Sequence, residues 1–162
     1  MATTTLSAAA TTRLTNAGFS QAQINEIQRS NTSTNTLVEK IEKFVVGRGT
    51  FTNEIPEGTV WVPGDNRINF GFSRVATAPN ALANQPIDEI IRLLSHELGH
   101  ATGTRQATGA TLSYVSPEAF SQARATGEGE AYLSEFQARS ERGGIVMSGQ
   151  TDDLFQRMFR EE

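Results

Sequence analysis

The chain has 162 residues, a formal net charge of −4 and a pI of about 5.3, and this length is typical of one folded domain. Its lysines and arginines are scattered along the sequence, whereas nucleic-acid-binding proteins cluster them, so we expect no nucleic-acid partner. No apolar run approaches the roughly 18 residues of a membrane span, and the absence of cysteine excludes disulfides, thiolate nucleophiles and cysteine-ligated metal sites.

The first 16 residues are rich in Thr, Ser and Ala, and Arg13 is their one charged side chain. This composition predicts a disordered tail over residues 1–16, followed by a single domain over residues 17–162. The tail lacks the continuous apolar segment of a signal peptide. We therefore expect a cytoplasmic protein or one exported by a specialised bacterial secretion system, because exported effectors without a leader often begin with such a segment.

Two helices are predicted in the next part of the chain. Ser20 and Gln23 have the spacing of a capping box for a helix that ends near Arg29. A second helix is predicted from Asn35 to Val45, because its apolar residues recur at helical spacing. Its inward-facing residues are expected to be Leu37, Val38, Ile41 and Phe44.

A β-hairpin is predicted after these helices. Residues 59–62 and 67–70 are rich in β-branched and aromatic side chains, and they flank the turn sequence Pro63-Gly64-Asp65-Asn66.

The clearest predicted helix runs from Ile87 to Thr102. Pro86 suits the position before a helix, the acidic residues of the first turn complement the helix dipole, and Gly103 is a natural stop. Three further helices are predicted, one opening near Ser116, one over residues 130–142 and one over residues 152–160.

The helix over residues 87–102 contains the sequence His96-Glu97-Leu98-Gly99-His100, which holds both histidines of the chain. Four residues rotate a helix by about 40° beyond one turn, so both imidazoles share one face. Apolar residues occupy the neighbouring stripe, so this helix can bury one side and present the imidazoles to a cleft. The alternative is that both are ordinary histidines on a helix surface.

This HExxH pattern is suited to catalytic zinc, which needs three protein ligands and an open position for water. His96 and His100 would supply two ligands, and Glu97 would accept a proton from the water as it attacks a carbonyl. Because the chain has no other histidine and no cysteine, the third ligand of such a site must be a carboxylate. The downstream candidates are Glu128, Glu130 and Glu135.

Over residues 87–138, the chain resembles the gluzincins, which are HExxH metallopeptidases whose third zinc ligand is a Glu on a following helix. Their Glu-Ala-x-x-x pattern matches Glu130-Ala131-Tyr132-Leu133-Ser134, and the resemblance therefore implies Glu130 as the third ligand. Glu128 is the alternative, since a Gly follows the ligand in another gluzincin variant. Ser134, at the position where the family usually has Asp, and Glu135 are the candidates to orient His96.

The resemblance also implies an α+β, zincin-like fold that is mainly helical, with a small β-sheet over the HExxH helix. An edge strand of the hairpin at residues 59–72 would bind substrate in extended form. For stabilising the oxyanion we favour Tyr114, which follows a Gly- and Thr-rich loop, over the three other candidates. Those candidates are Tyr132, Arg139 and Arg142.

The activity implied is zinc-dependent hydrolysis of peptide bonds in a restricted protein target, as in compact bacterial effector and toxin metallopeptidases. Two rival interpretations use the same residues. One is a non-enzymatic protein-binding module on a zincin scaffold, and the other is an amidase that acts on cell-wall peptides.

Overall fold

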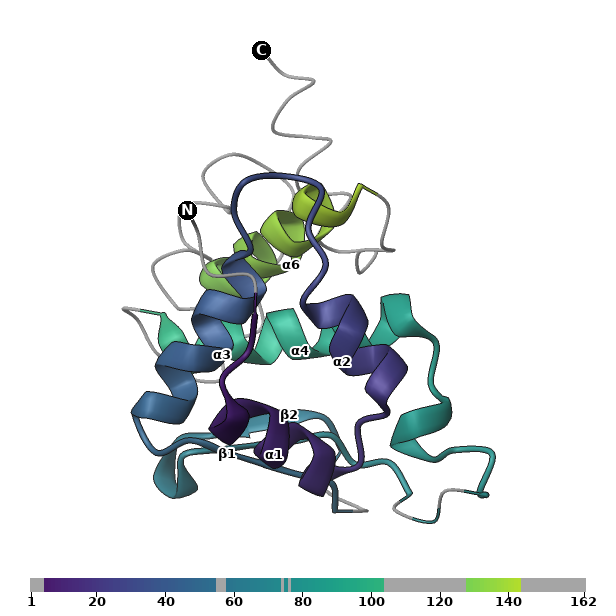
Figure 1. Cartoon of the computed structure of the whole chain (residues 1–162). Coiled ribbons are helices and arrows are strands. Elements are labelled where there is room, and N and C mark those ends of the chain that lie inside the picture. Colours follow the sequence, from purple (N-terminus) through teal and green to yellow (C-terminus); the bar gives the residue numbers. More distant parts are fainter. Residues whose placement is uncertain (1–4, 55–57, 74, 76, 104–127, 144–162) are drawn as a thin grey trace, which may run out of the picture.

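The computed structural model describes residues 5–54, 58–73, 75, 77–103 and 128–143 (Figure 1). These residues form an α+β arrangement of helices around a small sheet. In chain order, the helices and strands are α1 (Ala8–Ala17), α2 (Gln21–Ile27), α3 (Thr36–Val46), β1 (Thr50–Thr52), β2 (Val60–Val62), β3 (Arg67–Asn69), α4 (Ile87–Thr102) and α6 (Glu128–Arg142).

Helix α1 lies where a disordered tail was expected. Ser7 caps it by accepting a hydrogen bond from the Ala10 backbone, and Gly18 ends it in the left-handed region at φ 113°. The few apolar residues of this segment, among them Leu14, are buried in the common core, and α1 packs against β1. The prediction of disorder is therefore wrong for residues 5–16, because burial against distant residues outweighs the weak local pattern.

Helices α2 and α3 confirm their predictions. Both hydrogen bonds of the capping box between Ser20 and Gln23 are present, and Asn35 caps α3 by accepting from the Val38 backbone at 3.1 Å. The residues expected to face inward on α3 are buried. Local capping and helical spacing were sufficient to place these two helices.

The sheet has the strand order β1-β3-β2. Strands β2 and β3 are antiparallel, with Trp61 opposite Ile68, so the predicted hairpin is confirmed. Strand β1 was not predicted; it pairs with β3 in parallel, with Phe51 opposite Ile68. Helix α1 contacts β1, and α4 contacts β2, so the sheet lies against the HExxH helix.

Helix α4 begins and ends as predicted, from Ile87 to Thr102 with Gly103 after it. Figure 1 shows α6 on one side of α4 and the sheet on the other. The two helices approach closely at Gly99, where an added Cβ would lie 2.5 Å from the Ala131 Cα. Helix α6 starts at Glu128, earlier than predicted, and includes the buried Gly129.

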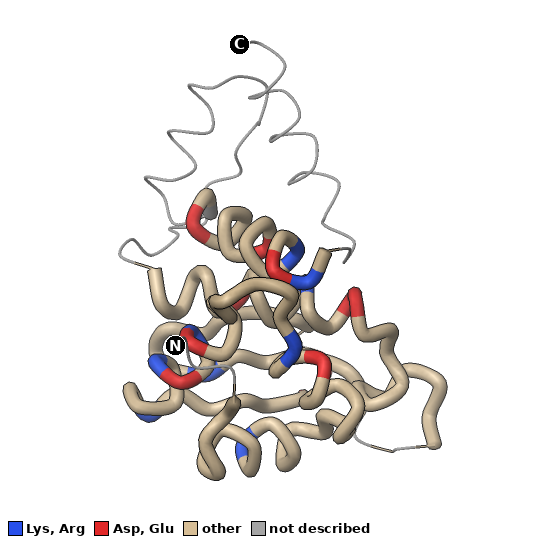
Figure 2. Tube along the Cα trace, turned by 45° about the horizontal axis from the view of Figure 1, so that its top comes forward, with Lys and Arg blue, Asp and Glu red and all other residues tan. Residues whose placement is uncertain are grey.

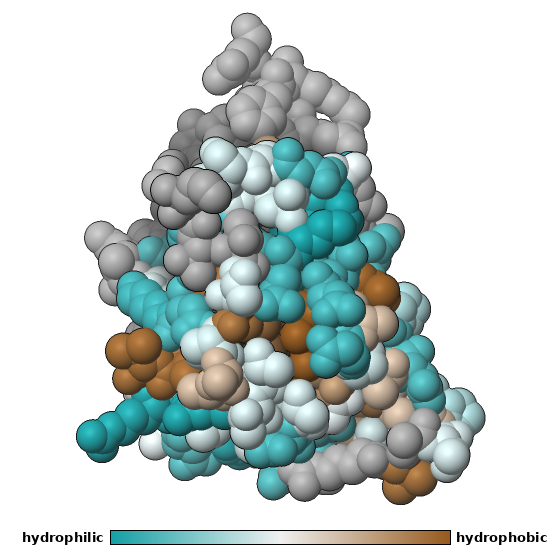
Figure 3. Space-filling model, viewed as in Figure 1, coloured by the Kyte–Doolittle hydropathy of each residue, from teal (hydrophilic) through white to brown (hydrophobic). Residues whose placement is uncertain are grey.

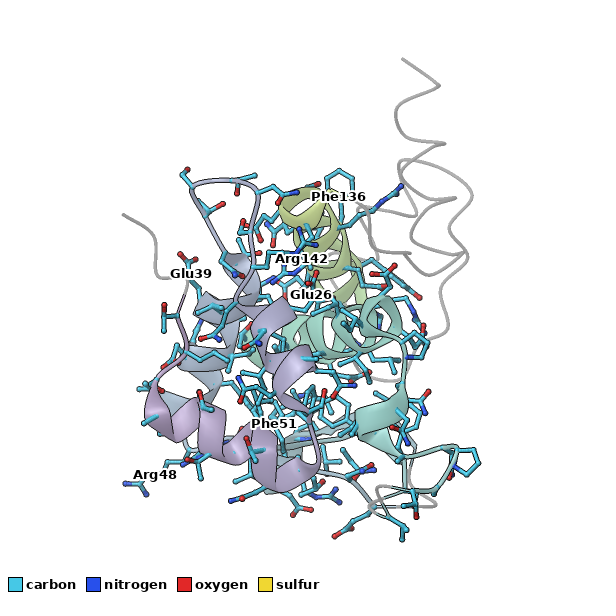
Figure 4. All side chains as sticks on the ribbon, turned by 45° about the vertical axis from the view of Figure 1, so that its right-hand side comes forward. Glu26, Glu39, Arg48, Phe51, Phe136 and Arg142 are labelled. Atoms are coloured by element: carbon cyan, nitrogen blue, oxygen red, sulfur yellow. The ribbon has the colours of Figure 1, made fainter. Side chains whose placement is uncertain are left out.

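The C-terminal end of α6 is anchored by two buried charged residues, Glu141 and Arg142. Figure 4 shows Arg142 close to Glu26 of α2. The Glu141 carboxylate accepts from the Thr36 backbone at 2.9 Å and from its hydroxyl at 2.7 Å, at the first turn of α3. Arg142 donates to the Ile27 carbonyl at 2.5 Å and to that of Glu26 at 3.4 Å, and burial lowers its pKa. These bonds fix α6 to the segment between α2 and α3.

No helix among the described residues is both long enough and apolar enough to cross a membrane. On the face seen in Figure 3, hydrophobic residues emerge in separate patches among hydrophilic ones, and acidic and basic residues are intermingled in Figure 2. The helices predicted near Ser116 and over residues 152–160 lie outside the described residues.

Candidate metal centre

The two histidines lie together on one face of α4. Their ring centroids are 5.0 Å apart and the ring planes meet at 76°. The His96 side chain is 17% exposed, and His100 is buried. This is the pairing expected from a spacing of four residues on a helix.

Glu135 of α6 is hydrogen-bonded to the His96 ring. The His96 Nδ1 donates a hydrogen bond to Glu135 Oε2 at 2.8 Å, and the Glu135 side chain is fully buried. A carboxylate that accepts from Nδ1 favours the tautomer whose Nε2 carries a lone pair, which is the atom that binds a metal. Of the two residues considered for orienting His96, Glu135 is thus the one in contact. Ser134 Oγ is buried and has no hydrogen-bond partner among the described residues.

The aromatic ring of Tyr132 packs against the His96 ring. The centroids are 5.0 Å apart, the planes meet at 68°, and Tyr132 is buried. Sequence reasoning named Tyr132 only among the candidates for stabilising the oxyanion and missed this contact. The signal available was its position three residues before Glu135, since residues three apart share a helix face.

Glu97 follows His96 and is turned about 100° from it around α4. It is buried, with 8% of its surface exposed. Burial of a carboxyl group costs free energy unless polar or charged partners compensate for it. The burial of Glu97 is observed, and its role as the general base stays a prediction.

Glu130, the third ligand implied by the resemblance, lies at the end of α4. It lines a pocket of about 250 Å³ that includes neither imidazole. A Cβ added at Gly103 would overlap the Glu130 Oε2, so the carboxylate occupies the space that the glycine leaves. The other residues that line this pocket include Lys40, Gly99, Thr102 and Gln137.

Lys40 of α3 enters the same pocket. Its Nζ donates to Gln137 Oε1 at 3.1 Å. Burial lowers the pKa of Lys40 to about 8, and the negative charges of Glu141 and Glu130 oppose that shift. Nothing in the sequence connected Lys40 with Glu130, because the two residues are far apart along the chain.

The described residues fit a zinc site in part. His96 and His100 offer two ring nitrogens on one turn of α4, and the buried carboxylate of Glu135 is hydrogen-bonded to His96. Both features suit zinc. Within the described ranges, no group of three His, Cys, Asp or Glu side chains is arranged to hold a metal. The side chain of Glu128 and the whole of Tyr114 lie outside the described part of the chain.

The hairpin expected to bind substrate lies against α4. Strand β2 forms one edge of the sheet as described and contacts α4. Main-chain groups on an edge strand are available to pair with an extended peptide. Substrate binding at this edge remains a prediction.

Comparisons with known proteins add no relative from which a function could be carried over. The chain matches no family model, and no match was found among curated proteins or solved structures.

Proposed function

We propose that this protein is a zinc-dependent peptidase of the gluzincin type, with a zincin-like fold. His96, His100 and Glu130 would bind the metal, and Glu97 would act as the general base. The observation that carries the proposal is the hydrogen bond from His96 Nδ1 to the buried Glu135. An ordinary surface histidine does not need a buried carboxylate to fix its tautomer, whereas a metal-ligating histidine is usually held in this way.

Each residue has a distinct task in this mechanism. Zinc, when bound, would supply the Lewis acidity that activates water and polarises the substrate carbonyl. Glu97 takes the proton from the attacking water onto its carboxylate and delivers it to the leaving amine nitrogen. Glu135 and Tyr132 keep the His96 ring in one orientation, and Nε2 would be the atom of that ring that binds zinc. Tyr114 is our candidate for donating to the oxyanion.

The substrate that we propose is a peptide segment of a restricted protein target, bound in extended form along β2. The contact between β2 and α4 supports this choice, because it brings an edge strand to the helix that carries Glu97. Export as a bacterial effector or toxin is part of the same proposal and rests on the resemblance described above.

The second candidate function is a protein-binding module without catalytic activity. It is favoured by the position of Glu130, which lies in a pocket with Lys40 and not with the imidazoles. An amidase acting on cell-wall peptides would use the same residues as the peptidase. A cleavage profile against peptide and cell-wall substrates separates these three functions.

Replacing Glu97 with Gln tests the proposal. The substitution keeps size and hydrogen bonding but removes the basic carboxylate, so zinc stoichiometry and folding should stay near those of the wild type. Peptide hydrolysis should fall by at least about a hundredfold. The measurement pairs zinc content with cleavage of a peptide library by the wild type and the variant.

Glu89→Gln is the matched control, because Glu89 lies on the same helix and its partly exposed side chain pairs with Arg92. It should leave both quantities unchanged. Near-normal cleavage by zinc-loaded Glu97→Gln would show that another group activates the water. No zinc and no cleavage in the wild type would favour the binding module.

A further inference from the structure

The sequence contains two lysines, Lys40 and Lys43, and both lie on α3. They differ in their surroundings. Lys43 donates to the Thr102 carbonyl at 3.3 Å on the surface. Lys40 lines the pocket of about 250 Å³ that α3, α4 and α6 form together, and it donates to Gln137 Oε1 at 3.1 Å. The two lysines are therefore a matched pair, one of which borders a cavity.

The ammonium group of Lys40 makes no ion pair with any described residue. Its hydrogen bond goes to the neutral amide oxygen of Gln137, and Lys40 is only partly exposed to solvent. A partly buried ammonium loses hydration, and without a carboxylate in contact that loss favours the neutral amine. The neutral amine is the nucleophilic form of a lysine.

The charged groups around Lys40 leave this preference in place. Burial is the strongest influence and lowers the pKa of Lys40 to about 8. Glu141 and Glu130 of α6 raise the pKa from beyond ion-pair distance, and Lys43 lowers it. The described residues of α4 that line the pocket carry no titratable side chain. At pH 7 about a tenth of Lys40 is neutral, against roughly one part in 2,500 for an ordinary lysine with a pKa near 10.4.

The pocket has room for a small molecule beside this amine. Its volume of about 250 Å³ is several times the roughly 30 Å³ that one water occupies in the liquid. Thr102, Gln137 and Glu130 line it, and such residues suit a ligand with hydroxyl groups. A ligand carboxylate would meet the negative charges of Glu130 and Glu141, which act at this position. A neutral, hydroxylated ligand therefore fits the pocket better than an anion.

We propose that Lys40 is a nucleophilic lysine whose pocket binds small hydroxylated aldehydes as reversible imines. The amine nitrogen attacks the carbonyl carbon, the carbonyl oxygen leaves as water, and the imine nitrogen keeps one proton. Ammonium and aldehyde thus give a protonated imine and one water, without an oxidant or a reductant. The positive charge stays on the same nitrogen, where Glu130 and Glu141 favour it. This site goes beyond the proposed function and needs neither zinc nor the histidines.

The test uses the full wild-type chain with glycolaldehyde as the probe, and with cyanoborohydride to reduce each imine to a stable amine. Mass spectrometry of the digested protein gives the rate of modification at each lysine. At pH 7, Lys40 should react at least about tenfold faster than Lys43, because an ordinary lysine is almost entirely protonated at this pH. Comparable rates at the two lysines, or faster reaction at Lys43, would overturn the inference.

The pH profile distinguishes a nucleophilic lysine from a merely accessible one. The Lys40 rate is divided by that of a lysine in an unstructured reference peptide in the same mixture. This ratio should stay constant up to about pH 8 and then fall, because Lys40 is by then largely neutral while the reference amine is still losing its proton. A ratio that stays flat up to about pH 10 would contradict the proposal.

Gln137→Glu tests the role of the surroundings. It places a carboxylate where Lys40 now has a neutral acceptor, so the ammonium is stabilised and the Lys40 rate at pH 7 should fall roughly threefold to tenfold. Gln21→Glu, on the exposed face of α2, is the matched control and should leave that rate unchanged. An unchanged rate in Gln137→Glu would also overturn the inference. None of these measurements uses zinc or peptide cleavage, so the inference and the proposed function can fail separately.

Discussion

At the scale of single residues, the contact between His96 and Glu135 defines the candidate site most sharply. The carboxylate is fully buried and lies 2.8 Å from Nδ1. A buried carboxylate loses its hydration, and this loss must be offset by a strong hydrogen-bond donor. His96 is that donor, and its ring is further confined by Tyr132.

Glu135→Gln should lower zinc affinity by about tenfold, within the range found for residues that orient a metal-ligating histidine. The amide oxygen can still accept from Nδ1, so the fold should be retained, but the lost negative charge makes His96 a poorer ligand. The measurement is the zinc dissociation constant, with the exposed Glu39→Gln as control. Unchanged affinity would show that Glu135 does not tune this ligand.

At the scale of secondary-structure elements, the packing of α4 against α6 decides which side chains meet. Gly99 permits that packing, because an added Cβ would lie 2.5 Å from the Ala131 Cα and 2.9 Å from both the Glu130 carbonyl oxygen and the Ser134 Cβ. Two of these neighbours are backbone atoms, which cannot move unless the helix moves. The close approach brings Tyr132 and Glu135 to His96.

Gly99→Ala should therefore destabilise the fold, by at least about 1 kcal/mol in the free energy of unfolding. Alanine favours a helix interior by about 1 kcal/mol over glycine, so the clash must exceed that gain. Denaturant unfolding of the variant measures the change. Gly64→Ala is the control, because a Cβ at Gly64 would meet nothing within 4 Å. Equal stability of the two variants would contradict a tight α4–α6 contact.

At the scale of the whole molecule, the candidate site joins segments that are distant in the chain. Helix α4 contacts α2, α3, β2 and α6, and the buried Glu141 and Arg142 connect α6 to the segment between α2 and α3. A ligand that bridges α4 and α6 would therefore stabilise the domain as a unit, because it would bind the native state and not the unfolded chain.

Removal of zinc from the reconstituted protein should lower its melting temperature. At a free zinc concentration about a thousand times the dissociation constant, the stabilisation is about 4 kcal/mol. For a chain of this size, that corresponds to a shift of roughly 8–16 °C. Thermal unfolding with and without a chelator measures it. The His96→Ala/His100→Ala variant should show no response, and an equal response in that variant would locate the metal elsewhere.

Local sequence patterns determined much of the fold. Caps and turns act through hydrogen bonds and backbone preferences within a few residues, so they can be recognised without the rest of the chain. Examples are the helix caps at Ser20 and Asn35, the turn before Arg67 and the helix end at Gly103. The shared face of His96 and His100 follows from helix geometry for the same reason.

Other features were decided by tertiary structure alone. Helix α1 and strand β1 have weak patterns of their own and are stabilised by burial of Leu14 and Phe51 against distant residues. The choice of Glu135 as the partner of His96, and the location of Glu130 beside Lys40, depend on how α6 is rotated and where it crosses α4. The residues that share a helix face could be read from the sequence, because the spacing along a single helix decides them. The faces that meet depend on how several helices pack, because the spacing within one helix carries no information about its neighbour.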